Sequence, residues 1–484
     1  MNAERPRIVV IGGGITGLAA AHRIIELSEQ APAERRPSVL LLEASDRLGG
    51  VIRSAAHEDC LIELGPDSFI TQKPWALELC RRLGLQERII QTSGLFRRAF
   101  VVHRGRMCPV PEGFMMLAPT QWWPFISSPL FSPLGKLRMA LDLVLPRGKK
   151  GKDESLSRFV LRRLGREALE RAAQPLIGGI YTADPERLSL MATMPRFLEL
   201  EEKYGSVIKG MIAESKSGAS GRSAAGSPDG AVRYSLFVTL DRGMSVLVER
   251  LAERIGADNL RTAARAGGLA RDPAGGAWTI ELSGGETIAA DAVIVSLPAR
   301  AASALLAGID EELAGDLGRI RAASSAAVNF VFRRSDIAHP LDSFGFVVPA
   351  IERRSVVACT FSSAKFAGRA PADKVVLRAF LGGALAPQII ELSDDTLLEA
   401  AMKDLRELLG ISGAPLASLV SRFPSSMPQY DVGHLDLVSR IEARAGALPG
   451  LALAGNAYHG VGIPDCVRSG EQAAETVVRY LANR

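Results

Sequence analysis

The chain has 484 residues, enough for about three domains at ~150 residues each. It is 47% hydrophobic and 23% charged, which is typical of a globular protein and excludes a disordered or fibrous chain. Its five cysteines form no CxxC pair and its six histidines no HExxH motif, so we expect no metal site and a cytoplasmic, reducing compartment. No apolar run reaches the 18 residues of a membrane-spanning helix.

The net charge of +5 is concentrated between Lys136 and Arg171, where 11 basic residues outweigh five acidic ones. This segment is either a solvated helix face with a basic loop or a surface for an anionic lipid or substrate. Nucleic acid is not expected, because no aromatic residues alternate with the charges. The preceding residues 113–135 are uncharged and aromatic. They form either a core-packed loop or an apolar patch at a substrate mouth or a peripheral membrane contact.

The predicted elements begin with a buried strand at 7–11, a glycine turn, a helix over 18–27 and a strand at 39–42. Prolines break any long helix within 113–135, and residues 215–231 read as a flexible loop. Further strands are predicted at 278–282 and 291–297, then in a second block at 328–332, 346–348, 355–361 and 375–381. A last strand at 451–454 precedes a helix over 469–481.

A glycine motif lies between the first strand and the first helix. Gly12, Gly14 and Gly17 form GxGxxG, which lets the backbone turn tightly beside a pyrophosphate at a helix N-terminus. Glu43 ends the second strand, where a carboxylate accepts hydrogen bonds from a ribose 2′-hydroxyl and repels a 2′-phosphate. The βαβ unit therefore predicts a dinucleotide site that disfavours NADP.

Two further motifs favour FAD over NAD. The segment Glu43-Ala-Ser-Asp-Arg47-Leu-Gly49-Gly50 resembles the second signature of the FAD-binding amine-oxidase-like superfamily. Leu453-Ala-Gly455-Asn456 resembles its closing FAD motif. The resemblance implies a discontinuous Rossmann-type FAD domain, with a sheet-based substrate domain and a helical domain in an α/β and α+β fold. We expect the FAD domain at 1–75, 233–300 and 420–484, the substrate domain at 76–115 and 301–419, and the helical domain at 116–232.

Four more motifs resemble the oxygen-dependent porphyrinogen oxidases of heme biosynthesis. They are Glu63-Leu-Gly65-Pro66-Asp67-Ser68-Phe69, Gly179-Ile-Tyr181 with Leu188-Ser-Leu, Ser426-Met-Pro-Gln-Tyr430-Asp-Val-Gly-His434, and Gly460-Val-Gly-Ile-Pro464-Asp-Cys466. The chain is most similar to the soluble Gram-positive form, which is associated with coproporphyrinogen III, whereas the mitochondrial and plastid relatives act on protoporphyrinogen IX. Asp67 stands where the mitochondrial enzymes have arginine, so that arginine's role does not carry over.

This resemblance implies the site residues. The FAD contacts map onto Gly12, Gly13, Gly14, Ile15, Thr16, Gly17, Glu43, Arg47, Gly50, Val51, Gly65, Pro66, Asp67, Ser68, Ala264, Asn456, Val461, Gly462 and Ile463. The substrate contacts map onto Lys73, Ile180, Val347, Thr360 and Phe380, with Lys73 as the propionate anchor. Thr360 is polar where the family has an apolar residue. We name no catalytic residue, and we expect noncovalent FAD because the segment Asn456-Ala457-Tyr458 lacks a tethering cysteine.

The implied activity is a six-electron oxidation of a porphyrinogen in three two-electron turnovers, with O2 as acceptor and peroxide as by-product. Coproporphyrinogen III is the expected substrate and protoporphyrinogen IX the alternative. An amine or carotenoid-precursor oxidase and a nonenzymatic protein of the same fold, such as the prenyl-GTPase escort proteins, are further alternatives. A peripheral contact with the inner face of the membrane and a hand-off of product to ferrochelatase are the other partner hypotheses.

Overall fold

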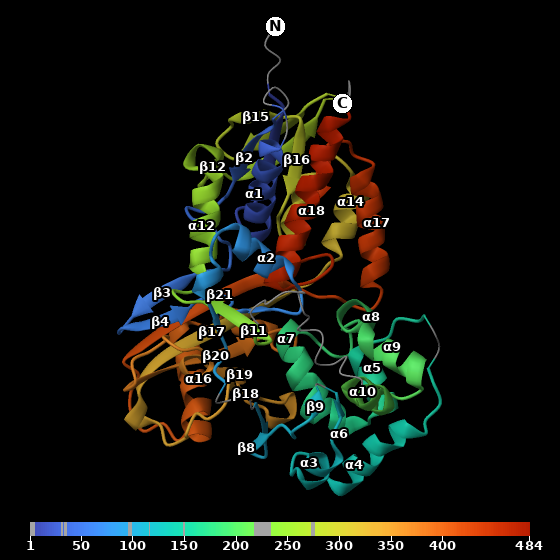
Figure 1. The fold of residues 1–484 in the computed structure, drawn as a ribbon, viewed down its shortest axis with the longest axis vertical. Helices are drawn as coiled ribbons and strands as arrows, with labels where there is room; N and C mark the ends of the chain where they lie inside the picture. Colours follow the sequence, from blue (N-terminus) through green and yellow to red (C-terminus); the bar gives the residue numbers. More distant parts are fainter. Residues whose placement is uncertain are drawn as a thin grey trace.

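The computed structural model describes residues 5–30, 32, 36–94, 99–115, 117–148, 151–216, 234–272 and 276–484. Almost all of the predicted flexible loop at 215–231 therefore lies outside the described residues. Figure 1 shows both termini at one end of the molecule, and α3 (Trp122–Ser127) and α4 (Pro133–Ala140) at the opposite end. These two short helices replace one long helix in the proline-rich segment, with Pro133 in the first turn of α4.

A five-stranded parallel sheet forms the end that carries the termini. Its strands lie in the order β12 (Leu260–Arg261), β2 (Ser38–Leu42), β1 (Arg7–Ile11), β16 (Ala292–Val295) and β22 (Leu451–Leu453). The apolar run at 7–11 makes the central strand because both of its faces are covered. Ile8 and Val10 pack in one core, and Val9 and Ile11 in another.

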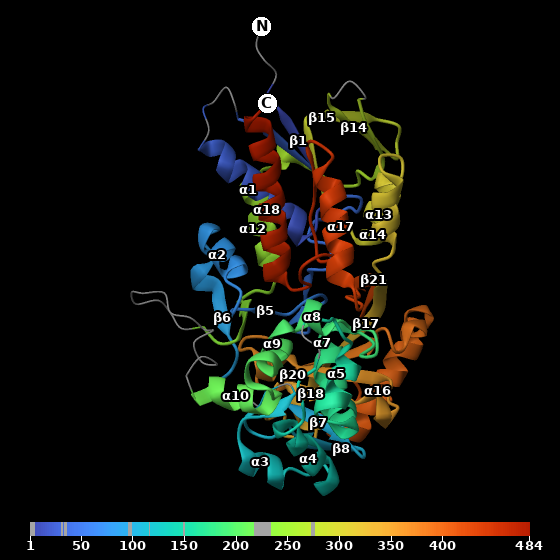
Figure 2. The same cartoon turned by 90° about the vertical axis from the view of Figure 1, so that its right-hand side faces the viewer.

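Helices cover one face of this sheet, and helices with a small sheet cover the other. The first face packs against α1 (Ile15–Glu29), α2 (Trp75–Arg82), α12 (Ser245–Ile255) and α18 (Ile463–Ala482). The second packs against α13 (Ala299–Leu306), α14 (Glu311–Gly318), α17 (His434–Gly446) and the antiparallel strands β13 (Ala266–Arg271), β14 (Trp278–Leu282) and β15 (Thr287–Ala290). Figure 2 shows α1, α12 and α18 on one side of this end and α13, α14 and α17 on the other.

A seven-stranded sheet forms the centre of the other half. Its order is β21 (Ala417–Pro428), β17 (Ala322–Arg333), β20 (Lys374–Gly382), β19 (Val356–Phe361), β18 (Gly345–Val347), β7 (Phe100–His103) and β8 (Arg106–Pro109). Only the β18–β7 pair is parallel. One face is covered by α16 (Asp394–Leu409) in a continuous apolar core. The opposite face is turned toward the rest of the molecule.

Small sheets join the two halves. The hairpin of β3 (Ser54–His57) and β4 (Cys60–Glu63) follows the second FAD motif. The strands β5 (Phe69–Ile70), β11 (Phe237–Leu240) and β6 (Ile89–Gln91) form an antiparallel trio. Cys60, Ile62 and Leu64 pack against Val331 and Val376 of the large sheet. The residues that precede Asp67 are therefore anchored on that sheet.

The helical region packs against the β7–β18 side of the large sheet. It contains the hairpin β9 (Phe114–Met115) and β10 (Ala118–Pro119), and the helices α5 (Leu156–Arg163), α6 (Arg166–Ala168), α8 (Leu190–Thr193), α9 (Pro195–Tyr204) and α10 (Val207–Lys216). Between α6 and α7 (Gly179–Tyr181) runs a π-helical segment, Leu169–Gly178, interrupted by Pro175. Such wide turns commonly occur beside functional sites.

Most of the described basic residues of segment 136–171 form ion pairs or hydrogen bonds within the helical region. Arg163 is fully buried with Asp142, and Arg162 pairs with Glu154 and Glu201. The side chains of Lys136 and Arg138 donate to backbone carbonyls. Most of these positive charges therefore stabilise the packing of the helices, although the side chains of Arg147, Lys152 and Arg158 stay exposed.

Most predicted strands are present, and the last helix begins earlier than expected. α18 starts at Ile463 rather than 469, since Pro464 suits a first helical turn. The domain boundaries remain a prediction, but two of them fall inside elements. The boundary at 420 divides β21, which pairs with β17 from Ala417 onward, and the boundary at 75/76 divides α2, which packs in the core of the parallel-sheet half.

Candidate functional site

The glycine turn after β1 is shaped by two close approaches and one open position. A Cβ at Gly12 would lie 2.3 Å from the carbonyl oxygen of Ser296, and one at Gly17 would lie 1.9 Å from that of Gly12. Gly12 also has a positive φ of 111°, which favours glycine. Gly14 is different, because no heavy atom lies within 4 Å of the position its Cβ would take. Its backbone, at the start of α1, is open to a ligand.

The first turn of α1 carries no counter-charge of its own. Among the described residues, no side chain caps this helix and no acidic residue lies in its first turn. The positive end of the helix dipole and its free N–H groups therefore suit a pyrophosphate. Thr16 lies against α18, where a Cβ at Gly470 would come within 2.2 Å of the Thr16 carbonyl oxygen. Ile15 and Thr16 are buried, so they fix the start of α1 and of α18 relative to each other.

Glu43 and Ala264 meet at the end of the parallel sheet. One carboxylate oxygen of Glu43 accepts from the Gly13 N–H at 2.7 Å, and the other accepts from Ser45. The N–H of Ala264 donates to the backbone carbonyl of Glu43 at 2.8 Å. Within the described residues, the oxygen bonded to Gly13 accepts only that bond and keeps a lone pair for a ribose hydroxyl, whereas the other oxygen already accepts from both the N–H and the hydroxyl of Ser45. The small side chain of Ala264 leaves this edge unobstructed.

The loop after β2 closes over the glycine turn. The guanidinium of Arg47 donates to the backbone carbonyls of Leu48, Gly50 and Ile52, so it holds the shape of its own loop. Gly50 has a φ of 58°, and a Cβ there would lie 3.3 Å from the Cα of Gly14. Val51 is exposed beside it, although it is a large apolar residue.

The segment Gly65–Ser68 lies directly under this loop. A Cβ at Gly65 would come within 1.8 Å of the Val51 carbonyl oxygen. The carboxylate of Asp67 pairs with Lys365 at 3.0 Å and accepts from the Ser68 hydroxyl at 2.6 Å. Although burial opposes ionisation, Lys365 and Arg378 lower the pKa of Asp67 to about 2. Pro66 and Asp67 thus place a fixed negative charge between the glycine turn and the large sheet.

The closing motif is held by two aromatic residues of the 426–434 segment. The Tyr430 hydroxyl donates to the Asn456 carbonyl and accepts from the Gly460 N–H. The His434 ring stacks on Tyr430 at 4.0 Å between centroids and contacts the Tyr458 carbonyl. Val461 and Gly462 then lead into α18, whose first residue, Ile463, is buried. Burial raises the pKa of the Cys466 thiol to about 12, so this thiol stays protonated.

Two of the predicted substrate residues lie beside this closing motif. Lys73 pairs with Asp465 in the first turn of α18, with 2.7 Å between Nζ and the nearer carboxylate oxygen. Ile180 is exposed on α7, next to Tyr181. Burial, with the nearby charge of Asp465, raises the pKa of Tyr181 to about 12. The structure therefore brings Lys73, Tyr181 and the closing motif together.

The other three lie on one face of the large sheet. Leu377, Ala379 and Leu381 of β20 pack toward α16, so Arg378 and Phe380 point the other way. The same alternation places Thr360 of β19 between Cys359 and Phe361 on that opposite face, and Val347 of β18 packs against the helical region. We call this face, turned away from α16, the site face.

Three residues on or beside this face were missed by the sequence interpretation. They are Asn329 of β17, Arg378 of β20 and Lys365 of α15 (Ser362–Lys365). Asn329 and Arg378 stand alone in the apolar runs Ala326–Phe332 and Val375–Leu381. A polar residue inside a buried strand is the signal that would have found them, since such a side chain needs a partner.

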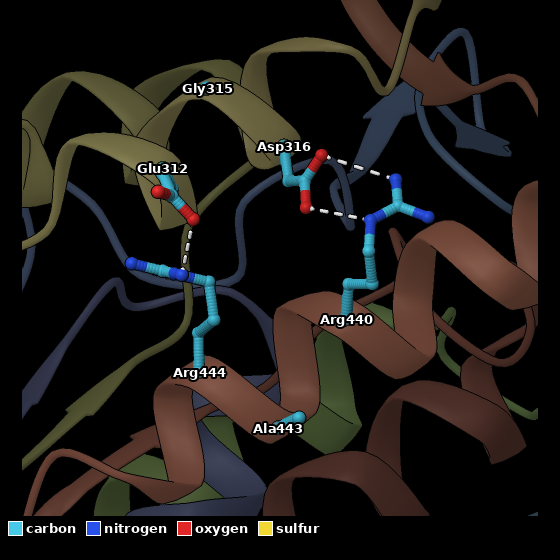
Figure 3. Close-up of a pocket in the computed structure, with 6 residues that line it drawn as sticks. All are labelled: Glu312, Gly315, Asp316, Arg440, Ala443 and Arg444. Carbon is cyan, nitrogen blue, oxygen red and sulfur yellow. Dashed lines mark hydrogen bonds and ion pairs between the residues drawn. The ribbon is translucent and has the colours of Figure 1, made fainter.

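A surface pocket between α14 and α17 lies on the far side of the parallel sheet. It is lined by Glu312, Gly315, Asp316, Arg440, Ala443 and Arg444. In Figure 3 the two arginines reach across to the two acids, and Arg440 and Arg444 each form an ion pair there. These paired charges hold α17 against α14, so the pocket has a structural explanation.

The residues at the glycine turn fit an FAD. The open backbone at Gly14, the uncapped start of α1 and the carboxylate of Glu43 match a pyrophosphate and a ribose. Among the described residues, no group of three or more histidine, cysteine or acidic side chains could hold a metal ion. None of the described helices combines the length and apolar character needed to cross a membrane.

Comparisons with known proteins agree with this geometry. Residues 15–478 match the family of flavin containing amine oxidoreductases. The chain is 35% identical to coproporphyrinogen III oxidase of Bacillus subtilis, over 99% of this chain and 100% of that one. It is 33% identical to coproporphyrinogen III oxidase of Staphylococcus aureus, over 98% and 99%. Protoporphyrinogen oxidase of Nicotiana tabacum is 29% identical over 98% and 86%.

Solved structures give the same result. A crystal structure of a protein from Exiguobacterium sp. 255-15, assigned as a protoporphyrinogen oxidase, superposes with a TM-score of 0.85 at 30% identity, and each chain is covered to 99%. Reduced UDP-galactopyranose mutase shares the fold, with a TM-score of 0.71 at 18% identity. The chain belongs to the flavin containing amine oxidoreductases and, within them, to the porphyrinogen oxidases. The predicted fold class, cofactor and enzyme class are confirmed, and the protein is an FAD-dependent oxidoreductase.

Proposed function

We propose that this enzyme oxidises coproporphyrinogen III to coproporphyrin III, consuming three O2 and releasing three H2O2. The observation that carries the proposal is the 33–35% identity, over nearly the whole chain, to two relatives named coproporphyrinogen III oxidase. Protoporphyrinogen oxidases are also relatives, at 29% identity for the tobacco protein, so protoporphyrinogen IX is the competing substrate.

The chain's own contribution is to hold the macrocycle in a dry, oriented position. When bound, FAD supplies the two-electron redox chemistry and its link to O2. Val347 and Phe380 offer apolar surface on the site face for the pyrrole rings. Lys73, at the edge of the site, offers a positive charge to a propionate in place of its bond to Asp465. The catalytic power is then orientation and exclusion of water rather than a strong base.

Stoichiometry tests the reaction itself. Purified holoenzyme is given coproporphyrinogen III in air-saturated buffer while O2, peroxide and porphyrin fluorescence are followed together. Three O2 consumed and three peroxides formed per porphyrin, above the autoxidation of a boiled sample, are expected. A ratio near one would contradict a full six-electron oxidation by this enzyme.

A second proposal concerns membrane contact. Trp123, Ile126, Leu134, Leu137 and Val144 are all more than half exposed, and they belong to α3, α4 and the turn that follows. Figure 1 shows α3 and α4 together at the end farthest from the termini. Apolar side chains gathered on short helices favour insertion into the headgroup region of a bilayer. We propose that this end rests on a membrane that contains anionic lipid.

Vesicle binding tests this proposal. The holoenzyme should sediment with phosphatidylglycerol-containing vesicles, and the double variant Leu134→Ser, Leu137→Ser should stay in solution with its flavin content unchanged. Equal sedimentation of both proteins would contradict the proposal.

Since the product is a metal-free porphyrin, we also propose delivery to the iron-inserting ferrochelatase. Faster metal insertion with the enzyme present than with free coproporphyrin supports it, and equal rates contradict it.

A further inference from the structure

Two rows of side chains cross the centre of the site face. In the first row, Asn329 of β17 is the register partner of Arg378, and Arg378 is the partner of Thr360 on β19. In the second row, Phe380 is the partner of Ala327 on one side and of Ala358 on the other, and Ala358 pairs with Val347. The first row is polar and the second apolar. Side chains of directly paired residues lie about 5 Å apart at Cβ, so each row is continuous.

Two residues of the polar row are buried with unpaired polar atoms. Arg378 is 4% exposed and Asn329 is fully buried. Within the described residues, Nε of Arg378 and both polar atoms of the Asn329 side chain lack a hydrogen-bond partner. The Arg378 guanidinium lies over the Phe380 ring at 4.6 Å, so the arginine is in contact with the apolar row. Leaving such groups unpaired is costly, so they require an explanation, and a bound ligand that completes the hydrogen bonding is one.

The charges around the row leave Arg378 as the unmatched cation. Lys365 is paired with Asp67 at 3.0 Å, and Arg369 faces Glu63 at 3.5 Å. Both acids attract Arg378 from a distance, but among the described residues neither forms an ion pair with it. This part of the site therefore has one positive charge in excess, on a group that presents a planar fork of donors. A carboxylate matches that fork.

We propose that Arg378 binds a propionate carboxylate of the substrate, and that the Thr360 hydroxyl and the unpaired Asn329 amide complete the contact. The proposal rests on the proposed function and deepens it. Coproporphyrinogen III has four propionates where protoporphyrinogen IX has two, with vinyl groups in place of the others. An arginine fork at this point discriminates for the carboxylate and against the vinyl. The polar Thr360, which departs from the apolar residue of the family, then belongs to the recognition of a charged substituent.

The test measures the kinetics of each variant with both substrates. It also measures product binding, which needs no turnover. In Arg378→Met, kcat/KM for coproporphyrinogen III should fall about 30-fold, and that for protoporphyrinogen IX less than threefold. Binding of coproporphyrin III to the holoenzyme, followed by fluorescence, should weaken in parallel. Thr360→Val, which keeps shape and removes only the hydroxyl, should raise KM for coproporphyrinogen III about threefold at unchanged kcat. Flavin content and Tm are measured for each variant.

The matched control is Arg354→Met. Arg354 is also a mostly buried arginine, but it pairs with Asp404 and Glu407 on the α16 side of the sheet. The Arg354→Met variant should have a lower Tm, but the ratio of its kcat/KM values for coproporphyrinogen III and protoporphyrinogen IX should be that of the wild type. The inference is overturned if Arg378→Met lowers kcat/KM equally for both substrates. It is also overturned if coproporphyrin III binds to Arg378→Met and Thr360→Val as tightly as to the wild type. A wild-type enzyme that prefers protoporphyrinogen IX overturns the proposed function instead, and the coproporphyrin binding of the variants still decides the role of Arg378.

Discussion

The hydroxyl of Tyr430 lies 2.6 Å from the backbone carbonyl oxygen of Asn456, to which it donates a hydrogen bond. The hydroxyl oxygen of Tyr430 in turn accepts a hydrogen bond from the N–H of Gly460 at 2.8 Å. One buried side chain thus holds both ends of the closing loop that precedes α18. This explains why two motifs about 30 residues apart occur together, because the first fixes the backbone that the second presents to the cofactor.

Replacing Tyr430 should loosen that loop. Tyr430→Phe removes both hydrogen bonds but keeps the ring that stacks on His434. We expect a loss of about 1–2 kcal/mol in stability and weaker retention of FAD. Flavin released during dialysis and the Tm of the holoenzyme measure the two effects. Tyr480→Phe, on the partly exposed side of α18, is the control and should change neither. Full flavin retention by Tyr430→Phe would show that the loop does not depend on these bonds.

The glycines of the turn should separate folding from cofactor binding. Gly17→Ala places a Cβ against the Gly12 carbonyl and should prevent normal folding. Gly14→Ala meets open space and has a φ of −70°, which any residue adopts, so the chain should fold. The new methyl group would instead obstruct the pyrophosphate. Circular dichroism and FAD titration distinguish the two variants. Normal FAD affinity in Gly14→Ala would contradict the placement of the cofactor.

Lys73 should act on substrate binding rather than on the chemical step. In Lys73→Met we expect KM for coproporphyrinogen III to rise about tenfold with kcat nearly unchanged, because a charge at the edge of a site mainly aids capture. Lys209→Met, an exposed lysine on α10, serves as the matched control. Steady-state porphyrin fluorescence gives both constants. If KM stays the same while stability falls, Lys73 only pairs with Asp465.

The partly buried carboxylate of Asp67 should make the stability of the folded protein depend on pH. Its pKa is about 2 in the folded protein and about 3.9 in an unfolded chain. Since the folded pKa is the lower one, ionisation favours folding. This contribution is complete above about pH 5 and is lost progressively as the pH falls through about 2. By linkage it amounts to about 2–3 kcal/mol.

The variant Asp67→Asn tests that value. Urea unfolding at pH 7, 4 and 3 should show that the stability advantage of the wild type over Asp67→Asn shrinks as the pH falls. Asp258→Asn, at an exposed position, should differ from the wild type by a constant amount. A gap for Asp67→Asn that does not change with pH would mean that the ionised carboxylate is not stabilised in the folded protein.

The part of the site around the glycine turn could be predicted from local sequence patterns. The apolar run at 7–11, the glycines and Glu43 lie within one βαβ unit, so spacing alone predicts their contact. The site face could not be predicted in this way. Arg378, Asn329 and Thr360 come from three strands, and only the register of β17, β20 and β19 aligns them. The charge of segment 136–171 was also ambiguous, because burial of Arg163 with Asp142 is a tertiary contact.

The most direct test of the account is the ratio of kcat/KM for coproporphyrinogen III to that for protoporphyrinogen IX. The two porphyrinogens are oxidised separately by the purified holoenzyme in air, and porphyrin fluorescence is corrected for autoxidation. We expect a ratio well above ten. A ratio below one would assign protoporphyrinogen IX as the substrate, and activity with neither would contradict a porphyrinogen as the substrate of this site.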